Sequence, residues 1–285
     1  MHIDWMSSSI AKLGRAKEHR DTLGNEIQRF LQSEPYTVSV HVDFDASRFE
    51  ARAHEKHRPD TVRWGLIFGE ALYNIRCALD YLAYALTILD TGEDPPLEAG
   101  EIQFPLVTEA KKWGSTMESR IPRVGTTVQA AIETLQPYHR HDDETIKNRI
   151  GDHPLELLAT LNNADKHRLL PVIAVWKAQV AYHSTMPNGG SPYVDVEPDH
   201  ARSFQLTTRL DHALKENAVI GIGVFNINGP NPAVHVGAKV SPAMVVEYER
   251  RDRSRSLDFP VTGLDRIITF VEGEVFGRIA RALGA

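Results

Sequence analysis

The sequence contains a single cysteine, Cys77, which excludes an intramolecular disulfide bond. This low cysteine content fits a reducing cytosol. The chain has no uninterrupted apolar run near the roughly 20 residues that a membrane-spanning helix needs. Its first residues, MHIDWMSSS, show no basic-then-apolar signal pattern. We therefore expect a cytoplasmic protein without a membrane partner.

Positive charge is not in excess either. Lysine and arginine number 32 against 38 aspartates and glutamates, and the net charge is −6 at pH 7. Proteins that coat nucleic acid usually carry a basic excess. The net charge therefore gives no support for nucleic acid as a partner, although it leaves open a local basic site.

Several short catalytic motifs are absent. The sequence has no Walker loop, no GxGxxG after a predicted strand, no GxSxG elbow and no HExxH. These absences argue against P-loop and Rossmann nucleotide binding and against the α/β-hydrolase and zinc-protease classes. No cofactor follows from the sequence, and no metal site is assigned.

What the sequence does contain is an ordinary globular composition, with 42% hydrophobic and 25% charged residues in 285. Its first part is dominated by helical periodicity, interrupted by two alternating runs at about residues 36–57 that predict a β-hairpin. The predicted helices span residues 10–31, 64–89, 108–120, 126–135 and 154–168.

The strongest helical pattern lies at residues 64–89. Apolar residues there step by four and three without a break, which is typical of a helix packed along its length against another helix. They are Phe68, Leu72, Ile75, Leu79, Leu82, Leu86 and Leu89. This apolar seam can be covered within the chain or by a second copy, so a homodimer is compatible with it. Arg76 and Asp80, at i and i+4 on a wetter stripe, are expected to touch.

After Pro171 the pattern changes to short β-branched runs between turn signals, and an amphipathic helix follows at residues 260–283. We therefore predict an α+β fold, with a helical N-terminal half packed beside an antiparallel β-sheet and closed by a C-terminal helix. Residues 1–170 would form the mainly helical part with the hairpin, and residues 171–285 the β-rich part with the C-terminal helix. One continuous domain is also compatible with this order.

A polar cluster stands out in the segment LNNADKHRLL. Asn162 and Asp165 fall on the same predicted helical stripe as Leu155 and Leu158. A buried amide or carboxylate costs a few kcal/mol unless it is partnered. We therefore expect another segment to supply partners, and the stripe that carries Arg76 and Asp80 is the best candidate.

The segments EALYNIRCALDYLAY and LNNADKHRLL together resemble a widespread bacterial family of uncharacterised proteins. In that family a helix with an N-x-R-x-A-L-D-x-L pattern is followed, after an FP segment, by L-N-x-x-D-K-H-R. The matching residues are Tyr73, Asn74, Arg76, Ala78, Leu79, Asp80, Leu82, Leu161, Asn162, Asp165, Lys166, His167 and Arg168. The resemblance covers roughly the middle half of the chain and implies no particular activity.

A more distant similarity is to HEPN-type helical domains, many of which are ribonucleases in defence and toxin systems. Their hallmark is an arginine followed after a short spacer by a histidine on a helix. The matches here run from Arg48 to His54 and from Arg52 to His57, within the predicted hairpin. In the predicted central helix the order is reversed, since His167 precedes Arg168.

These residues support two hypotheses. In the first, the chain is a binding or regulatory protein, and Arg76 pairs with Asp165 while Asp80 pairs with Arg168 or His167 in a buried network. In the second, it is a phosphate-ester hydrolase or ribonuclease. His167, Asp165 and Asp80 would then be catalytic, and the ligand would contact Arg76, Lys166, Arg168 and Asn162. Solvent access to His167 separates the two.

Three other features have ordinary explanations beside functional ones. His139 and His141, with a nearby carboxylate, could serve a metal-dependent enzyme, but a solvated loop is the favoured interpretation. The basic segment at residues 250–255 could contact phosphate or simply form a solvated hairpin tip. Cys77 is interpreted as a partly buried structural cysteine.

Overall fold

The helix α2 (Thr61–Thr91) is the longest element of the structure, and its apolar seam is buried. In this computed structural model Phe68, Leu72, Ile75, Leu79, Leu82 and Leu86 all have 0% exposure. Only Leu89, at the end of the seam, is half-exposed. Because the seam is covered within the chain, a homodimer would have to use other surfaces, and it stays a prediction.

The structure describes residues 6–43, 48–139, 153–168, 170, 172–185, 217–224, 233–249 and 256–284. The chain divides into two compact units. We call the first the helical unit; it comprises Met1–Asn25, Val62–Pro171 and Val246–Ala285. The second, the strand unit, comprises Glu26–Thr61 and Val172–Val245.

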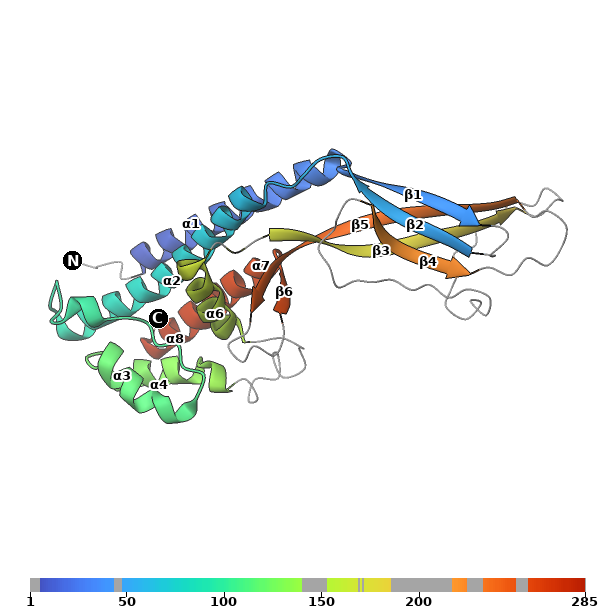
Figure 1. The fold of residues 1–285 in the computed structure, drawn as a ribbon. Helices are drawn as coiled ribbons and strands as arrows, with labels where there is room; N and C mark the ends of the chain where they lie inside the picture. Colours follow the sequence, from blue (N-terminus) through green and yellow to red (C-terminus); the bar gives the residue numbers. More distant parts are fainter. Residues whose placement is uncertain are drawn as a thin grey trace. The chain divides into compact units, whose positions relative to one another are not determined.

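In the helical unit α1 (Ser7–Gln32) runs antiparallel to α2 (Figure 1). The Lys12 Nζ lies 5.6 Å from the centre of the Tyr81 ring, and the His19 Nδ1 lies 3.2 Å from a Glu70 carboxylate oxygen. Leu13, Ala16 and Leu23 form the buried stripe of α1. The middle of α1 is highly charged, so this narrow apolar stripe is what holds it to its neighbours.

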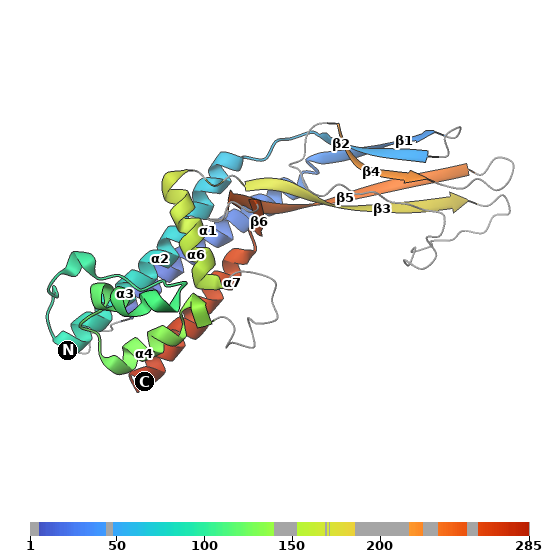
Figure 2. The ribbon, with the colours of Figure 1, turned by 60° about the horizontal axis from the view of Figure 1, so that its bottom comes forward.

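The helical unit contains further helices. They are α3 (Trp113–Arg120), α4 (Thr126–Thr134), α6 (Pro154–His167), α7 (Gly263–Thr269) and α8 (Gly277–Ala282), with a π-helix at Phe270–Phe276 between the last two. Short 3₁₀ turns lie at Ala99–Glu101, Ala110–Lys112 and Pro137–His139. The C-terminal helix packs against the helical unit, with α7 against α6 and α8 against α4 (Figure 2).

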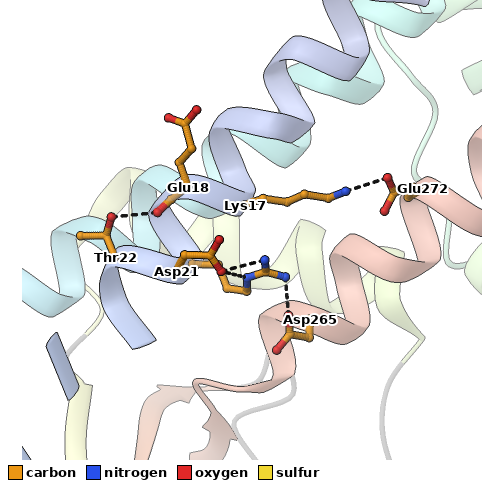
Figure 3. A network of polar contacts seen from close by, with 7 residues as sticks. Lys17, Glu18, Asp21, Thr22, Asp265 and Glu272 are labelled. Carbon is orange, nitrogen blue, oxygen red and sulfur yellow. Dashed lines mark hydrogen bonds and ion pairs between the residues drawn. The ribbon is translucent and has the colours of Figure 1, made fainter. Parts of the chain in front are cut away.

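Ion pairs also connect the charged face of α1 to the C-terminal helix (Figure 3). Arg20 donates to Asp265, and Lys17 donates to Glu272, each over 2.6 Å. All four side chains are partly exposed, so each pair contributes at most about 1 kcal/mol. The buried residues of α7 and α8, such as Leu264 and Ile279, therefore account for most of the attachment.

The strand unit contains the predicted hairpin, formed by β1 (Tyr36–Asp43) and β2 (Arg48–Glu55). The other edge of β2 pairs antiparallel with β4 (Ala218–Val224), with a register shift between Ala51 and Arg52. A further sheet has the order β3 (Val172–Thr185), β5 (Ala233–Glu249) and β6 (Ser256–Pro260), of which β6 falls in the residue range of the helical unit.

The α+β class, the hairpin and the C-terminal helix are therefore confirmed. One detail differs, because β5 is a single strand of 17 residues where the sequence predicted short runs. Part of the stretch after Pro171 in which short strands were predicted, residues 186–216, lies outside the described residues.

The two units alternate along the chain, whereas the sequence favoured a single boundary near residue 170. The reason is pairing at long range: β2 takes β4 as its neighbour, and α7 and α8 pack on α6 and α4. Within the described ranges, no helix is both long enough and apolar enough to cross a membrane.

Candidate functional site

We call EALYNIRCALDYLAY, on α2, the first motif and LNNADKHRLL, which lies largely on α6, the second motif. The start of α6 is well defined. Pro154 occupies the first turn, where no backbone N–H is needed, and the His153 Nδ1 accepts a hydrogen bond from the Leu155 N–H at 3.2 Å. Leu155, Leu158 and Leu161 are fully buried. These contacts fix the rotation of α6 and thereby the direction of its polar residues.

On α2, Arg76 and Asp80 form a two-pronged ion pair, as their spacing predicts. The Arg76 Nε donates to one Asp80 oxygen at 3.0 Å, and Nη2 donates to the other at 2.7 Å. Their side chains are 16% and 28% exposed. Such forked arginine–carboxylate pairs are stronger and more directional than single contacts.

The same pair holds the FP segment. Arg76 Nη2 donates to the Phe104 carbonyl at 3.0 Å, and the Phe104 N–H donates to the Asp80 Oδ1 at 3.0 Å. The Phe104 side chain itself is 1% exposed. Both backbone groups of one residue are therefore satisfied by an ion pair on a helix that lies far away in the sequence.

We call the contacts among Arg76, Asp80 and Phe104 the clamp. The charge of a residue on α6 acts on this clamp. Burial raises the pKa of Asp80 above its ordinary value, while the Arg76 charge, the Phe104 N–H and the Lys166 charge act to lower it. Lys166 belongs to the second motif. The structure thus brings the ends of the two motifs close enough for their charges to interact.

Asp165 contacts α2 at a different point, Gly69. A Cβ atom added to Gly69 would lie 2.6 Å from the Asp165 Cγ, so only glycine leaves room for this carboxylate. Burial raises the pKa of Asp165. Within the described part of the chain Asp165 has no hydrogen-bond or ion-pair partner. The carboxyl group is therefore half-buried against a helix backbone without a compensating cation.

The pairing differs from the network that the sequence suggested. Arg76 pairs with Asp80 rather than with Asp165, because i and i+4 side chains on one helix meet without any change in helix packing. Asn162 is buried, with 5% exposure, as its stripe predicts. Lys166, His167 and Arg168 are all exposed at the C-terminal end of α6. The solvent access of His167 therefore favours the hydrolase hypothesis, whereas the closed Arg76–Asp80 pair favours the binding hypothesis.

Two features of the structure were not predicted as part of the site. Phe104 belongs to the FP segment that the resemblance described above includes. The sequence did not show which groups the backbone of Phe104 would contact. Gly69 sits in an ordinary helical run, and its role depends only on the close approach of α6.

The other candidate features are described only in part. No group of metal-ligating side chains with suitable geometry occurs in the described ranges, and His141 lies outside them. The basic segment at residues 250–255 also lies outside the described residues. Cys77 is half-buried and forms no disulfide, and the neighbouring Cys77 thiol raises the pKa of Tyr73.

Comparison with known proteins adds no assignment, because no family model, curated protein or solved structure matches this chain. The chemistry available to the site is therefore read from its geometry. It offers one saturated ion pair, one unpaired half-buried carboxyl group, and three exposed side chains that can carry positive charge.

The contact at Gly69 generates a first prediction. Gly69→Ala should fail to give the stabilisation of about 0.5–1 kcal/mol that alanine normally brings to a helix interior, and should destabilise the fold instead. Gly24→Ala is the matched control, because a Cβ at Gly24 meets nothing within 4 Å. Urea unfolding measures both free energies.

Adding Asp165→Ala to Gly69→Ala should restore stability, since it removes the atoms that a new Cβ would meet. A Gly69→Ala variant as stable as Gly24→Ala would contradict the close contact between α2 and α6.

The raised pKa of Asp165 generates a second prediction. A carboxyl group whose pKa is higher in the folded state destabilises the fold as pH rises from its ordinary value of 3.8 through the folded value. Asp165→Asn should therefore be more stable than the parent at pH 7. The difference should close as the pH falls below about 4.

Thermal unfolding across this pH range measures the effect. A parent that is more stable than Asp165→Asn at pH 7 would show that the ionised carboxylate has a favourable partner.

Proposed function

We propose that this chain is a cytoplasmic binding or regulatory protein in which the first motif stabilises the helical unit. The observation that carries this proposal is the closed set of hydrogen bonds among Arg76, Asp80 and Phe104. An arginine that binds phosphate must present its fork to the ligand. Here the fork is already occupied by a carboxylate.

Asp80 is committed in the same way. Its Oδ1 accepts from both Arg76 and the Phe104 N–H, and its Oδ2 accepts from Arg76. A general base needs an oxygen that can reach a substrate proton. Using Asp80 as a base would require breaking contacts that hold the FP segment, which favours a structural role for this residue.

Binding by this protein would then fall to groups that the clamp leaves accessible. Lys166, His167 and Arg168 project from the end of α6 and are exposed. Cations at a helix C-terminus interact favourably with the helix dipole, so their position also stabilises α6. These three side chains are best suited to bind an anionic partner.

The structural role of the clamp generates a third prediction. Arg76→Lys and Asp80→Asn should each lower the free energy of unfolding by about 1–3 kcal/mol, because each leaves partly buried hydrogen-bonding groups unsatisfied. The double variant should lose less than the sum of the two, as expected for residues in contact. Urea unfolding of all four proteins measures the coupling.

Arg123 and Glu93 provide the matched control, since they form a comparable but more exposed ion pair, with side chains 36% and 48% exposed. Arg123→Lys and Glu93→Gln should have much smaller effects. Equal losses at the two pairs would remove the argument for a special role of Arg76 and Asp80.

A second candidate function is a phosphate-ester hydrolase or ribonuclease of the HEPN-like, defence-associated type. It is favoured by the exposure of His167, whose imidazole can reach a substrate, and by the exposed cations Lys166 and Arg168 on either side of it. Asp165 would assist as a half-buried carboxyl group with a raised pKa.

This candidate generates a fourth prediction. If it holds, the purified chain cleaves single-stranded RNA, and His167→Ala abolishes cleavage without unfolding the protein. His57→Ala is the control, because His57 is also exposed but belongs to the Arg–His match near the hairpin. Loss of cleavage in His57→Ala alone would move the activity to the hairpin.

Cleavage that a chelator abolishes would favour the metal-dependent alternative. Absence of cleavage in the parent would leave the binding function as the better proposal.

A further inference from the structure

One face of α2 is exposed although most of its side chains are apolar or aromatic. Its residues follow one another at helical spacings of three and four, on the side opposite to the buried seam. We call them the outer stripe: Val62, Leu66, Glu70, Tyr73, Cys77 and Tyr81. The four members other than Glu70 and Cys77 are half of the large apolar side chains that are exposed in the described residues. A continuous apolar patch of this kind typically marks an interaction surface.

Neighbouring elements contact α2 on both sides of the outer stripe. On one side is α1, whose Lys12 Nζ lies 5.6 Å from the centre of the Tyr81 ring. The His19 Nδ1 of the same helix lies 3.2 Å from a Glu70 carboxylate oxygen. On the other side are Asp165 of α6 and the clamp. The stripe itself stays accessible between these contacts.

The residues of the outer stripe are arranged symmetrically about residue 75. Tyr84 and Ile88, both half-buried, continue the stripe toward the C-terminal end of α2. If two copies of α2 lie antiparallel with a two-fold axis at residue 75, each stripe residue lies opposite another stripe residue. The apolar and aromatic pairs are then Val62 with Ile88, Leu66 with Tyr84, and Tyr73 with Cys77. A two-fold dimer requires such a self-complementary surface.

The charges at the stripe are complementary in the same arrangement. Glu70 lies opposite Tyr81 of the second copy, and Lys12 lies over the Tyr81 ring. The Glu70 carboxylate of each copy therefore approaches the Lys12 amine of the other. Glu70 is 59% exposed, and its contact with His19 uses one oxygen, so the other oxygen can accept from Lys12. Matched opposite charges fix the register of an interface, which favours a second copy over an unrelated partner.

The surface is also large enough for a stable dimer. At 1.5 Å per residue, the stripe from Val62 to Ile88 is about 40 Å long. With α1 beside it, the surface is about 20 Å wide, because a helix with its side chains is about 10 Å across. The resulting area of about 800 Å² per copy matches an interface of standard size.

We propose that the outer stripe is the interface of an antiparallel homodimer with its two-fold axis near residue 75. The apolar pairs bury the exposed side chains, and the two contacts between Glu70 and Lys12 set the register. The functions proposed above use the clamp and the end of α6. The dimer therefore depends on neither of them.

The first test measures mass by light scattering and the dimer dissociation constant by sedimentation equilibrium. The parent should have twice the mass of one chain. Leu66→Glu should raise the dissociation constant at least about tenfold, because it buries an unpaired charge in the interface. Leu97→Glu is the matched control, since Leu97 is 64% exposed and lies outside the stripe. It should leave the dissociation constant unchanged.

The second test reverses charges to identify the partner as a second copy in this register. Glu70→Lys and Lys12→Glu should each weaken the dimer, because each places like charges opposite one another. The double variant Lys12→Glu/Glu70→Lys should restore it. Glu118→Lys on α3 is the control, because Glu118 is exposed and the substitution changes the net charge equally. Thermal unfolding confirms that each variant is folded.

Three results would overturn the proposal. A parent that stays monomeric at every concentration measured would leave the stripe to a different protein. Equal dissociation constants for Leu66→Glu and Leu97→Glu would place a dimer interface elsewhere. A double charge reversal that does not restore the dimer would contradict the antiparallel register.

Discussion

Burial of α2 is the constraint on which the helical unit depends. Its apolar seam is inaccessible to water from Phe68 to Leu86, and each buried leucine or phenylalanine contributes about 1.5–3 kcal/mol. A helix covered this closely must satisfy or exclude every polar group at its contacts. On α2 this constraint is met at two places. One is Gly69, which lies against Asp165 of the second motif, and the other is the Arg76–Asp80 pair of the first motif.

These two places meet the constraint differently. At Arg76 and Asp80 opposite charges neutralise each other and also satisfy both backbone groups of Phe104. At Gly69 the missing side chain admits the Asp165 carboxylate, whose pKa burial then raises. The first arrangement is typical of architecture, whereas the second keeps a carboxyl group in a less favourable environment.

This asymmetry bears on function. Natural proteins often accept local destabilisation where a group is needed for binding or chemistry. The half-buried Asp165 and the exposed Lys166, His167 and Arg168 are adjacent in sequence, and both functions proposed above use the end of α6 that carries them.

Residue patterns were sufficient to predict the main elements and the local pairing. Helical and strand periodicities predicted α1, α2, α6, the hairpin and the C-terminal helix, because these patterns reflect which side of each element is buried. The i, i+4 spacing predicted the Arg76–Asp80 contact, because both residues lie on one helix.

The contacts between distant segments could not be predicted from residue patterns. Three contacts join residues that are distant in the chain. They are the hydrogen bonds of the Arg76–Asp80 pair with Phe104, the approach of Asp165 to Gly69 and the pairing of β2 with β4. Sequence periodicity shows that one face of an element is buried, but it does not show which other element covers that face. Such contacts depend on how whole elements pack, and that information lies in three dimensions.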